Sequence, residues 1–174
     1  MQNDTRIAVD VAKSVFEVAV SVRPGQVARR ERLTTAKQLP PVALLLTVPG
    51  LGLLTATALV AFLGDIRRFP SGRHLASYLG LTPREFSSGL KRRLGRISKR
   101  GDGYLRTLLI HGARSVLLHA RKAQPDRLRE WAHKLETTHV HNKAAVAVAN
   151  KLARIVWAVW SRQSPYASLA QAAA

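Results

Sequence analysis

A long stretch without any charged residue, residues 39–64, constrains the fold more than any other feature of the sequence. It is long enough to span a bilayer, because a membrane helix needs roughly 20 apolar residues. However, Pro49-Gly50-Leu51-Gly52 divides it into two short apolar pieces, and proline and glycine both interrupt helices. Apolar pieces this short are more often buried helices. We therefore expect two core helices at residues 42–48 and 53–63, joined by a tight turn, and no membrane span.

The positive charge of the chain is concentrated in one stretch. The formal net charge is +18, and eleven of the 28 Lys and Arg residues lie between residues 84 and 122, against only Glu85 and Asp102. Solubility alone needs a net charge of only about 2–8, with mixed signs. A concentrated positive field attracts polyanions and speeds their encounter. The charge pattern therefore predicts a nucleic-acid-binding protein that uses this stretch.

The rest of the composition excludes several other classes of protein. Apolar residues make up 47% of the chain, which is enough for a globular core. The chain has no cysteine, so disulfide frameworks and thiolate metal sites are excluded. No signal-peptide pattern precedes Arg6, and we expect a cytoplasmic protein. His139 and His141 have no third ligand nearby, so we interpret them as polar residues at a helix start.

The sequence changes character at Pro40-Pro41. Before these prolines, β-branched residues dominate short runs, and the pattern predicts strands at residues 7–11, 15–20 and 29–34. After them, apolar residues recur at helical spacing. We therefore predict a mainly α fold, in which a short N-terminal β fragment precedes a helical domain.

Several further helices are expected in the second part of the chain. Ser71 and Asn142 are candidate N-caps, and residues 81–103 lack an apolar period, so we expect an extended basic loop there. The helices that we expect lie at residues 71–79, 104–120, 125–135 and 142–160. The domain boundaries follow as an N-terminal fragment at 1–40, a helical domain at 41–164 and a disordered tail at 165–174.

The turn in the uncharged stretch is similar to a known DNA-binding motif. Residues 45–56 resemble the helix-hairpin-helix of DNA-repair and replication proteins. In such a turn Gly50 and Gly52 permit close approach of the backbone to a phosphate, while Leu51 packs into the core. The amides at the start of the following helix can then donate to phosphate oxygens. A purely structural αα-hairpin is the alternative, because the motif contains no Lys or Arg.

Two serines lie within the basic stretch, beside Gly89. A serine hydroxyl is a weak nucleophile unless its surroundings activate it. Arginines can stabilise the charge that develops on a phosphodiester under attack. From the residue types alone, a phosphate-binding loop with ordinary polar serines remains the preferred interpretation of Ser87 and Ser88.

A family resemblance favours a catalytic role. Much of the chain resembles the C-terminal domain of the IS-one-ten insertion-sequence transposases. The matching pieces are Pro49-Gly50-Leu51-Gly52, Gly64-Asp65-Ile66, Tyr78-Leu79-Gly80-Leu81-Thr82-Pro83, Ser88-Gly89, Gly95-Arg96-Ile97-Ser98-Lys99-Arg100-Gly101, Leu105-Arg106, His141-Asn142-Lys143-Ala144-Ala145 and Ala149-Asn150-Lys151-Leu152-Ala153. The resemblance implies a transposase that cleaves and rejoins DNA with Ser88 as its nucleophile, and Ser87 is the alternative.

The same resemblance extends to the N-terminal strand. Ile7-Ala8-Val9-Asp10-Val11-Ala12-Lys13 is similar to the first strand of the family's RuvC-like domain, where an aspartate binds divalent metal. It implies that Asp10 is a catalytic ligand of Mg²⁺. It also implies a structured guide RNA and a homo-oligomer as partners, besides DNA. The residues expected to contact DNA are Gly50, Gly52, Arg84, Lys91, Arg92, Arg93, Arg96, Lys99, Arg100 and Arg106.

The chain departs from the family in its acidic residues. Gln38 leads almost directly into the helical domain, and the other three acids of the family have no counterpart. A single carboxylate holds Mg²⁺ poorly. We therefore expect an internally deleted family member that binds DNA but is impaired in strand cleavage by itself. A non-catalytic basic nucleic-acid-binding protein is the alternative.

Overall fold

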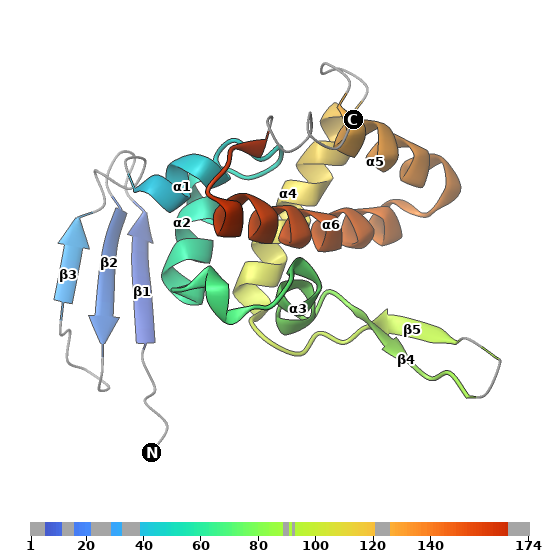
Figure 1. The fold of residues 1–174 in the computed structure, drawn as a ribbon, viewed down its shortest axis with the longest axis horizontal. Helices are drawn as coiled ribbons and strands as arrows, with labels where there is room; N and C mark the ends of the chain where they lie inside the picture. The colour runs from blue at the N-terminus through green and yellow to red at the C-terminus, as the bar shows by residue number, and fades with distance from the viewer. Residues whose placement is uncertain are drawn as a thin grey trace. The chain divides into compact units, whose positions relative to one another are not determined.

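The computed structural model describes residues 6–11, 16–21, 29–32, 39–88, 91, 93–120 and 126–166. The chain divides into two compact units, Met1–Pro40 and Pro41–Ala174. The fold is mainly helical, as predicted (Figure 1).

The first unit contains a three-stranded antiparallel sheet in the order β1-β2-β3. Its strands are β1 (Arg6–Val11), β2 (Phe16–Ser21) and β3 (Arg29–Arg32), which confirms the three expected strands. In the backbone register Asp10 lies opposite Glu17, and Glu17 lies opposite Arg32. The side chains of this sheet lie outside the described part of the structure.

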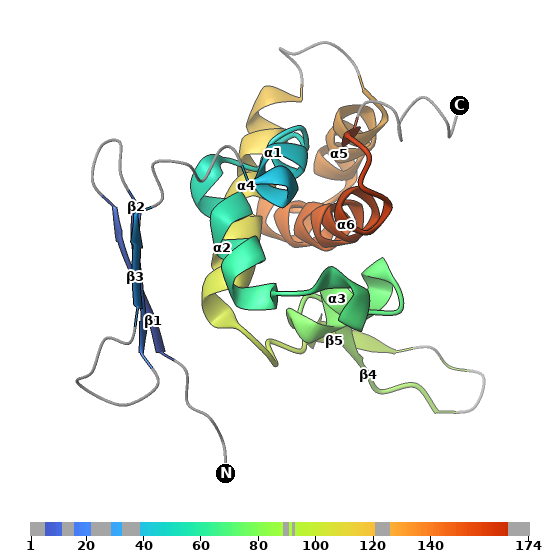
Figure 2. The same ribbon diagram turned by 60° about the vertical axis from the view of Figure 1, so that its left-hand side comes forward.

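The helical part surrounds one long central helix, α6 (Figures 1 and 2). This helix packs against α3, α4, α5 and η2. The elements are α1 (Pro40–Leu45), α2 (Leu53–Leu63), the 3-10 helix η2 (Ile66–Arg68), α3 (Gly72–Tyr78), β4 (Pro83–Glu85), β5 (Leu94–Ile97), α4 (Gly103–His119), α5 (Arg127–Thr138) and α6 (His141–Arg162).

The buried face of α6 explains its central position. Its buried residues recur at spacings of one, three and four, the pattern of a helix covered over a broad face. Many of them are alanines, whose small side chains let neighbouring helices approach closely. The buried residues are Ala144, Ala145, Val148, Ala149, Leu152, Ala153, Val156, Val159 and Trp160.

The expected cap of this last helix is wrong. Helix α6 begins at His141, with Val140 as its N-cap. Asn142 lies inside the first turn, where its Oδ1 accepts a hydrogen bond of 3.2 Å from Arg114. The side chain of Asn142 therefore contacts α4 and does not cap α6. The local sequence cannot indicate this contact, because Arg114 is 28 residues away.

The uncharged stretch forms two short helices of the core. Val42 and Leu45 in α1, and Leu59 in α2, are completely buried. Leu51 in the intervening turn is also buried, as expected for a residue that packs back into the core. Among the described residues, no helix is long and apolar enough to cross a bilayer.

Two glycines let the turn between α1 and α2 touch α4. Gly50 has a φ of +82°, and a Cβ placed there would lie 2.6 Å from the carbonyl oxygen of Gly112. A Cβ on Gly112 would in turn lie 2.3 Å from the carbonyl oxygen of Gly50. The two backbones are therefore in direct contact, with no room for a side chain on either.

Strands β4 and β5 form a β-hairpin within residues 81–103, where the sequence predicts an extended loop. Strands β4 and β5 pair antiparallel, with Pro83 opposite Ile97 and Glu85 opposite Leu94. The expectation failed because β4 is exposed throughout, and β5 is exposed except at Ile97. Neither strand has a buried face, so the alternation of apolar and polar residues that marks most strands is missing.

The helical unit continues at least to Tyr166. The amide of Tyr166 donates to Thr47 Oγ1 at 2.9 Å, and its ring packs against the core. Burial, together with the nearby charge of Asp126, raises the pKa of Tyr166 to about 12. Residues 167–174, which we expected to be disordered, lie outside the described residues.

The backbone contact at Gly112 makes a prediction about stability. Alanine at an open helix position is about 0.5–1 kcal/mol more stable than glycine. We expect Gly112→Ala to lower the free energy of unfolding by about 1–3 kcal/mol, because overpacking a close contact costs that much. Urea unfolding measures the change. Gly103→Ala is the matched control in the same helix, since its nearest atom is Arg106 Nη2 at 3.5 Å. Equal stability of the two variants would contradict the contact.

Tyr166 makes a prediction about alkaline pH. Its pKa is about 12 in the folded chain, against an ordinary value of 10.0, so folding favours the neutral phenol. This contribution to stability is complete below pH 10 and is lost as the pH rises towards 12. We expect one tyrosine to ionise with a midpoint near 12 when tyrosinate absorbance is followed. Tyr166→Phe should remove this step, and its persistence in that variant would refute the assignment.

Candidate nucleic-acid interface

In the first half of the basic stretch, strands β4 and β5 form a hairpin that projects from the helices of its unit (Figures 1 and 2). Beyond the paired strands, the amide of Phe86 donates to the carbonyl of Arg93 at 2.8 Å. Ser88 and Lys91 form a further antiparallel bridge, with hydrogen bonds in both directions. The paired backbone holds the side chains of this segment in a defined order along a ribbon.

Glycine permits a close backbone contact at the base of the hairpin. Gly101 has a φ of +94°, and its Cβ would lie 1.8 Å from the carbonyl oxygen of Tyr78. Gly80 has a φ of +68°, and its Cβ would lie 2.1 Å from the carbonyl oxygen of Arg100. The amide of Lys99 donates to the carbonyl of Gly80 at 3.1 Å. The segment that enters the hairpin at residues 78–80 therefore contacts the segment that leaves it at residues 99–101.

Helices α4 and α6 hold this base through side-chain donors. Arg106 donates to the carbonyl of Leu79 at 3.1 Å, and Asn150 donates to the carbonyl of Leu81 at 3.2 Å. Arg106 was predicted to contact DNA, yet its half-buried side chain binds the hairpin base. Its structural role is a finding, while its contact with DNA stays a prediction.

The other described cations of the hairpin are exposed. Arg84 reaches across the ribbon and donates to the carbonyl of Ser98 at 3.3 Å. Arg92 lies outside the described residues. None of the exposed hairpin cations forms an ion pair with a described residue. They are Arg84, Lys91, Arg93, Arg96, Lys99 and Arg100.

Two apolar side chains accompany these cations. Phe86 is 61% exposed and Leu94 is 46% exposed. The ring of Phe86 lies over Gly95 on the opposite strand, where a Cβ would come within 2.7 Å of Phe86 Cε2. Sequence reasoning missed both residues, although an aromatic residue among cations is a recognisable signal of nucleic-acid contact.

The hydroxyl groups of Ser87 and Ser88 differ in their hydrogen bonds. Ser87 Oγ donates to Glu85 Oε1 at 2.8 Å and accepts from the amide of Arg93 at 3.0 Å. The hydroxyl of Ser87 therefore ties the two sides of the hairpin together. The Ser88 hydroxyl makes no side-chain hydrogen bond to a described residue, and the whole residue is exposed.

The two glycines of the proposed helix-hairpin-helix also differ. Gly50 faces the backbone of Gly112, so an internal contact accounts for it. Gly52 is the exposed N-cap of α2, and no atom lies within 4 Å of the position of a Cβ there. Only Gly52 has the open surroundings that a phosphate would need.

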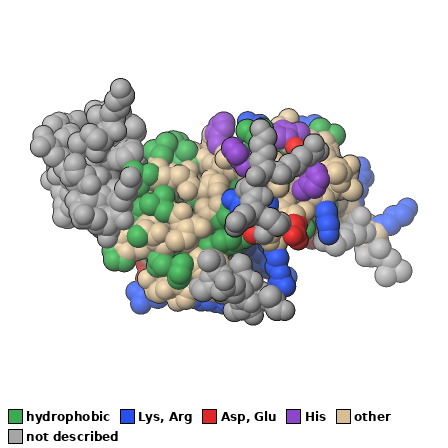
Figure 3. Space-filling model, turned by 90° about the horizontal axis from the view of Figure 1, so that it is seen from above, with side chains coloured by type: hydrophobic (Ala, Val, Ile, Leu, Met, Phe, Trp, Pro, Cys, Tyr) green, Lys and Arg blue, Asp and Glu red, His purple; other side chains and the backbone are tan. Residues whose placement is uncertain are grey.

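Acidic residues do not gather into a metal site in the described part of the chain. No group of three or more His, Asp or Glu side chains is close enough to hold a metal ion. Figure 3 shows histidines spread over one face. His139 contacts Thr138, and His141 contacts Glu136. The side chain of Asp10 lies outside the described residues.

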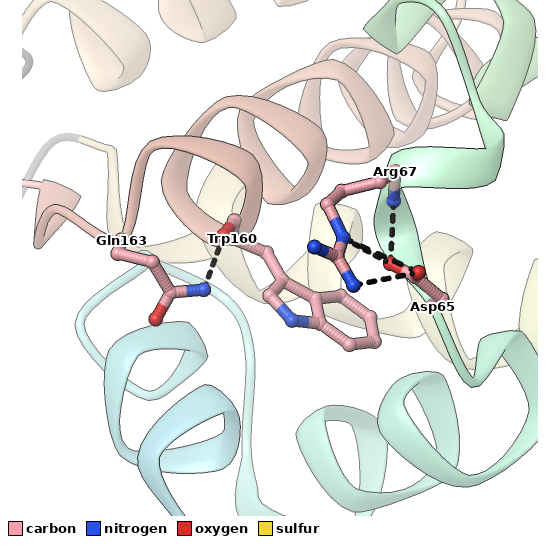
Figure 4. Close-up of polar contacts among 4 residues, drawn as sticks. All are labelled: Asp65, Arg67, Trp160 and Gln163. Atoms are coloured by element: carbon pink, nitrogen blue, oxygen red, sulfur yellow. Dashed lines mark hydrogen bonds and ion pairs between the residues drawn. The ribbon is translucent and has the colours of Figure 1, made fainter.

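Asp65 is paired with a neighbouring arginine. Its carboxylate accepts hydrogen bonds from the backbone and guanidinium of Arg67, at 2.9–3.2 Å. Figure 4 shows this pair beside the Trp160 ring, in a cleft of about 390 Å³ that Gln163 also lines. The hydrogen bonds from Arg67 hold the pKa of Asp65 below its ordinary value. The charges in this cleft therefore neutralise each other.

Comparison with known proteins places the chain among transposases. Residues 42–129 match the family described as Transposase IS116/IS110/IS902 family. The matched range contains the turn at Gly50, the whole hairpin and α4. It also includes the start of α5.

Individual transposases are also similar to the chain. The chain is 51% identical over 122 residues to a "Probable family 20 transposase" of Pseudomonas aeruginosa, covering 70% of this chain and 36% of that protein. It is 48% identical over 120 residues to the "Transposase for insertion sequence element IS1111A" of Coxiella burnetii, covering 69% and 33%.

A third relative has a different name. The chain is 32% identical over 125 residues to the "Pilin gene-inverting protein" of Moraxella lacunata, covering 71% of this chain and 38% of that protein. The chain thus spans about a third of the length of these relatives. On the match to its central residues, the chain belongs to the IS116/IS110/IS902 family of transposases.

Proposed function

We propose that this chain binds DNA through the β4–β5 hairpin and acts in DNA transposition as part of a transposase. The observation that carries the proposal is the row of exposed hairpin cations without a carboxylate partner among the described residues. Membership of the transposase family supports DNA as the polyanion. Because the chain spans only part of its relatives, the activity of a whole transposase remains a proposal for it.

The shape of the hairpin suits a groove of a nucleic acid. The major groove of DNA admits a two-stranded β-ribbon. Guanidinium groups on such a ribbon bind phosphates and set its position without reading sequence. Phe86 and Leu94 lie among these cations, so an apolar contact with bases or sugars accompanies the phosphate contacts in this proposal.

Ser88 is the proposed nucleophile. Its hydroxyl oxygen attacks the phosphorus of a DNA phosphodiester, and a covalent Ser88–phosphate bond forms as one P–O bond of the DNA backbone breaks. The serine hydroxyl gives up its proton to solvent, and the displaced deoxyribose oxygen takes up a proton and leaves as a hydroxyl group. Arginines beside it stabilise the negative charge of the transition state. Ser87 is the weaker candidate, because its hydroxyl holds the hairpin through Glu85 and Arg93.

The RuvC-like nature of the first unit, with Mg²⁺ at Asp10, stays a proposal from the resemblance. Two-metal chemistry needs several carboxylates. The described residues contain no group of three acidic or histidine side chains that could hold a metal ion. The described side chains therefore do not by themselves make up a complete Mg²⁺ site. We propose that the chain alone is impaired in strand cleavage.

The remaining expectations also rest on the resemblance. A helix-hairpin-helix contact with DNA would use Gly52 and the amides at the start of α2, because Gly50 packs against the backbone of α4. A guide RNA, a homo-oligomer and a cytoplasmic location are further proposals of the same kind. The alternative function is non-catalytic nucleic-acid binding, which the same exposed cations would support.

The phosphate contacts can be tested through the salt dependence of DNA binding. The logarithm of the DNA-binding constant falls as the logarithm of the salt concentration rises, and each phosphate contact makes this slope steeper by about 0.9. We expect Arg93→Gln with Arg96→Gln to weaken duplex binding and to reduce this slope by up to about 1.8. Lys134→Gln with Lys143→Gln removes the same charge from exposed helix positions and is the matched control. An identical slope for both double variants would exclude the hairpin as the contact.

The nucleophile can be tested through covalent DNA adducts. The chain is incubated with DNA that flanks its gene, with Mg²⁺, alone and together with the longer Pseudomonas aeruginosa relative. We expect the additional length of that relative to carry the acidic residues that the resemblance implies. Adducts of the two proteins separate by mass on a denaturing gel. We expect an adduct of the 19.1 kDa chain only in the mixture.

The two serines give opposite expectations in this assay. Ser88→Ala should remove the adduct of this chain without changing its affinity for DNA, whereas Ser87→Ala should retain it. Loss in Ser87→Ala alone would reassign the nucleophile. If the unsubstituted chain forms no adduct in the mixture, the non-catalytic alternative is favoured. An Mg²⁺-dependent adduct formed by the chain alone would contradict its proposed impairment.

A further inference from the structure

A second basic surface lies outside the hairpin, in a cleft between α3 and α6. The cleft has a volume of about 470 Å³. It is lined by Ser71, Gly72, Arg73, Lys151, Arg154, Ile155, Trp157 and Ala158. Three of these residues are cations and none is acidic.

A glycine brings the three cations together. Gly72 is the first residue of α3, and a Cβ there would lie 2.9 Å from the Cα of Arg154 on α6. The start of α3 therefore rests directly on the α6 backbone. This contact places Arg73 beside a pair of cations, Lys151 and Arg154, that are three residues apart on α6.

The charges of this cleft are not neutralised by the described residues. Arg73, Lys151 and Arg154 are exposed, and none of them forms an ion pair with a described carboxylate. The cleft at Asp65 differs in this respect, because its arginine is paired. Like charges at this spacing on a helix repel each other, so an anion held between them would relieve the repulsion.

Three apolar residues also line the cleft. Trp157 donates its indole N–H to the carbonyl of Phe69 at 2.8 Å, which fixes the ring. Ile155 and Ala158 are the other two apolar lining residues. Lys151 lies over the ring of Trp131, with its ammonium 5.6 Å from the ring centroid. A cleft lined by both cations and apolar side chains suits the phosphates and sugars of a nucleic-acid backbone.

We propose that the α3–α6 cleft is a second binding site for the phosphodiester backbone of nucleic acid, separate from the hairpin. The proposal takes only the class of ligand from the proposed function. Phosphates bind between Arg73, Lys151 and Arg154, and the sugars pack on Ile155 and Ala158. The contact is to the backbone, so it does not select a sequence.

The test compares two triple variants of the full chain. The cleft variant carries Arg73→Gln, Lys151→Gln and Arg154→Gln. The control carries Lys134→Gln, Lys143→Gln and Arg162→Gln, which removes the same charge from exposed positions outside the cleft. Binding of labelled duplex DNA and of an RNA of equal length is measured over a range of salt concentrations. Circular dichroism checks that both variants fold.

We expect the cleft variant to reduce the salt slope for duplex DNA by up to about 2.7, and the control to leave it nearly unchanged. A loss on both nucleic acids supports a shared phosphodiester site, and a loss on one of them assigns the site to that partner. A charge-preserving variant with Arg73→Lys, Lys151→Arg and Arg154→Lys should keep the original slope. If the cleft variant matches the control on both nucleic acids, the proposal is wrong.

The hairpin variant makes the two proposals separable. The cleft proposal survives if Arg93→Gln with Arg96→Gln has no effect while the cleft variant weakens binding. The opposite result retains the hairpin and overturns the cleft. Weakening by both variants supports two contacts, and their combination should then reduce the slope by the sum of the separate reductions.

Discussion

The contact between Gly50 and Gly112 is the constraint on which the helical unit depends. It joins the turn after α1 to the middle of α4, and a Cβ on Gly112 would also lie 3.9 Å from Leu152 of α6. Three segments that are distant in the sequence therefore meet at one position without a side chain. Because protein interiors are packed as densely as organic crystals, such a contact fixes the relative position of the elements that share it.

The position of the hairpin follows from this packing. Helices α4 and α6 supply Arg106 and Asn150, which bind the carbonyl groups of Leu79 and Leu81 at the entrance to the hairpin. The close contacts at Gly80 and Gly101 then join the two sides of the base. An exposed ribbon with little apolar packing of its own is thus held by a buried framework, which is a common arrangement for binding segments.

Charge distribution links the structure to its proposed role. The hairpin and the α3–α6 cleft both present cations that lack a carboxylate partner among the described residues. Elsewhere Asp65 and Asp126 each pair with an arginine two or three residues away. Local pairing neutralises the surface at those points, while the two basic surfaces keep their field for an external polyanion.

Sequence reasoning succeeded where a pattern is local. The three strands, the helices from residue 53 onwards and the buried Leu51 follow from propensity and apolar period. It failed for the hairpin, because exposed strands carry no apolar alternation. It also misjudged Asn142, whose side chain holds Arg114 of α4.

The sequence by itself determined that the chain is basic, mainly helical and similar to a transposase domain, because composition, periodicity and motifs are properties of neighbouring residues. Only the tertiary structure decided what each cation does. Arg106 binds the hairpin base, the hairpin arginines are exposed, and Arg73 and Arg154 line one cleft beside the contact at Gly72. The physical reason is that packing brings together residues that are far apart in the chain. The surroundings of a charged side chain then decide whether it binds a group of the protein itself or is free to bind an external ligand.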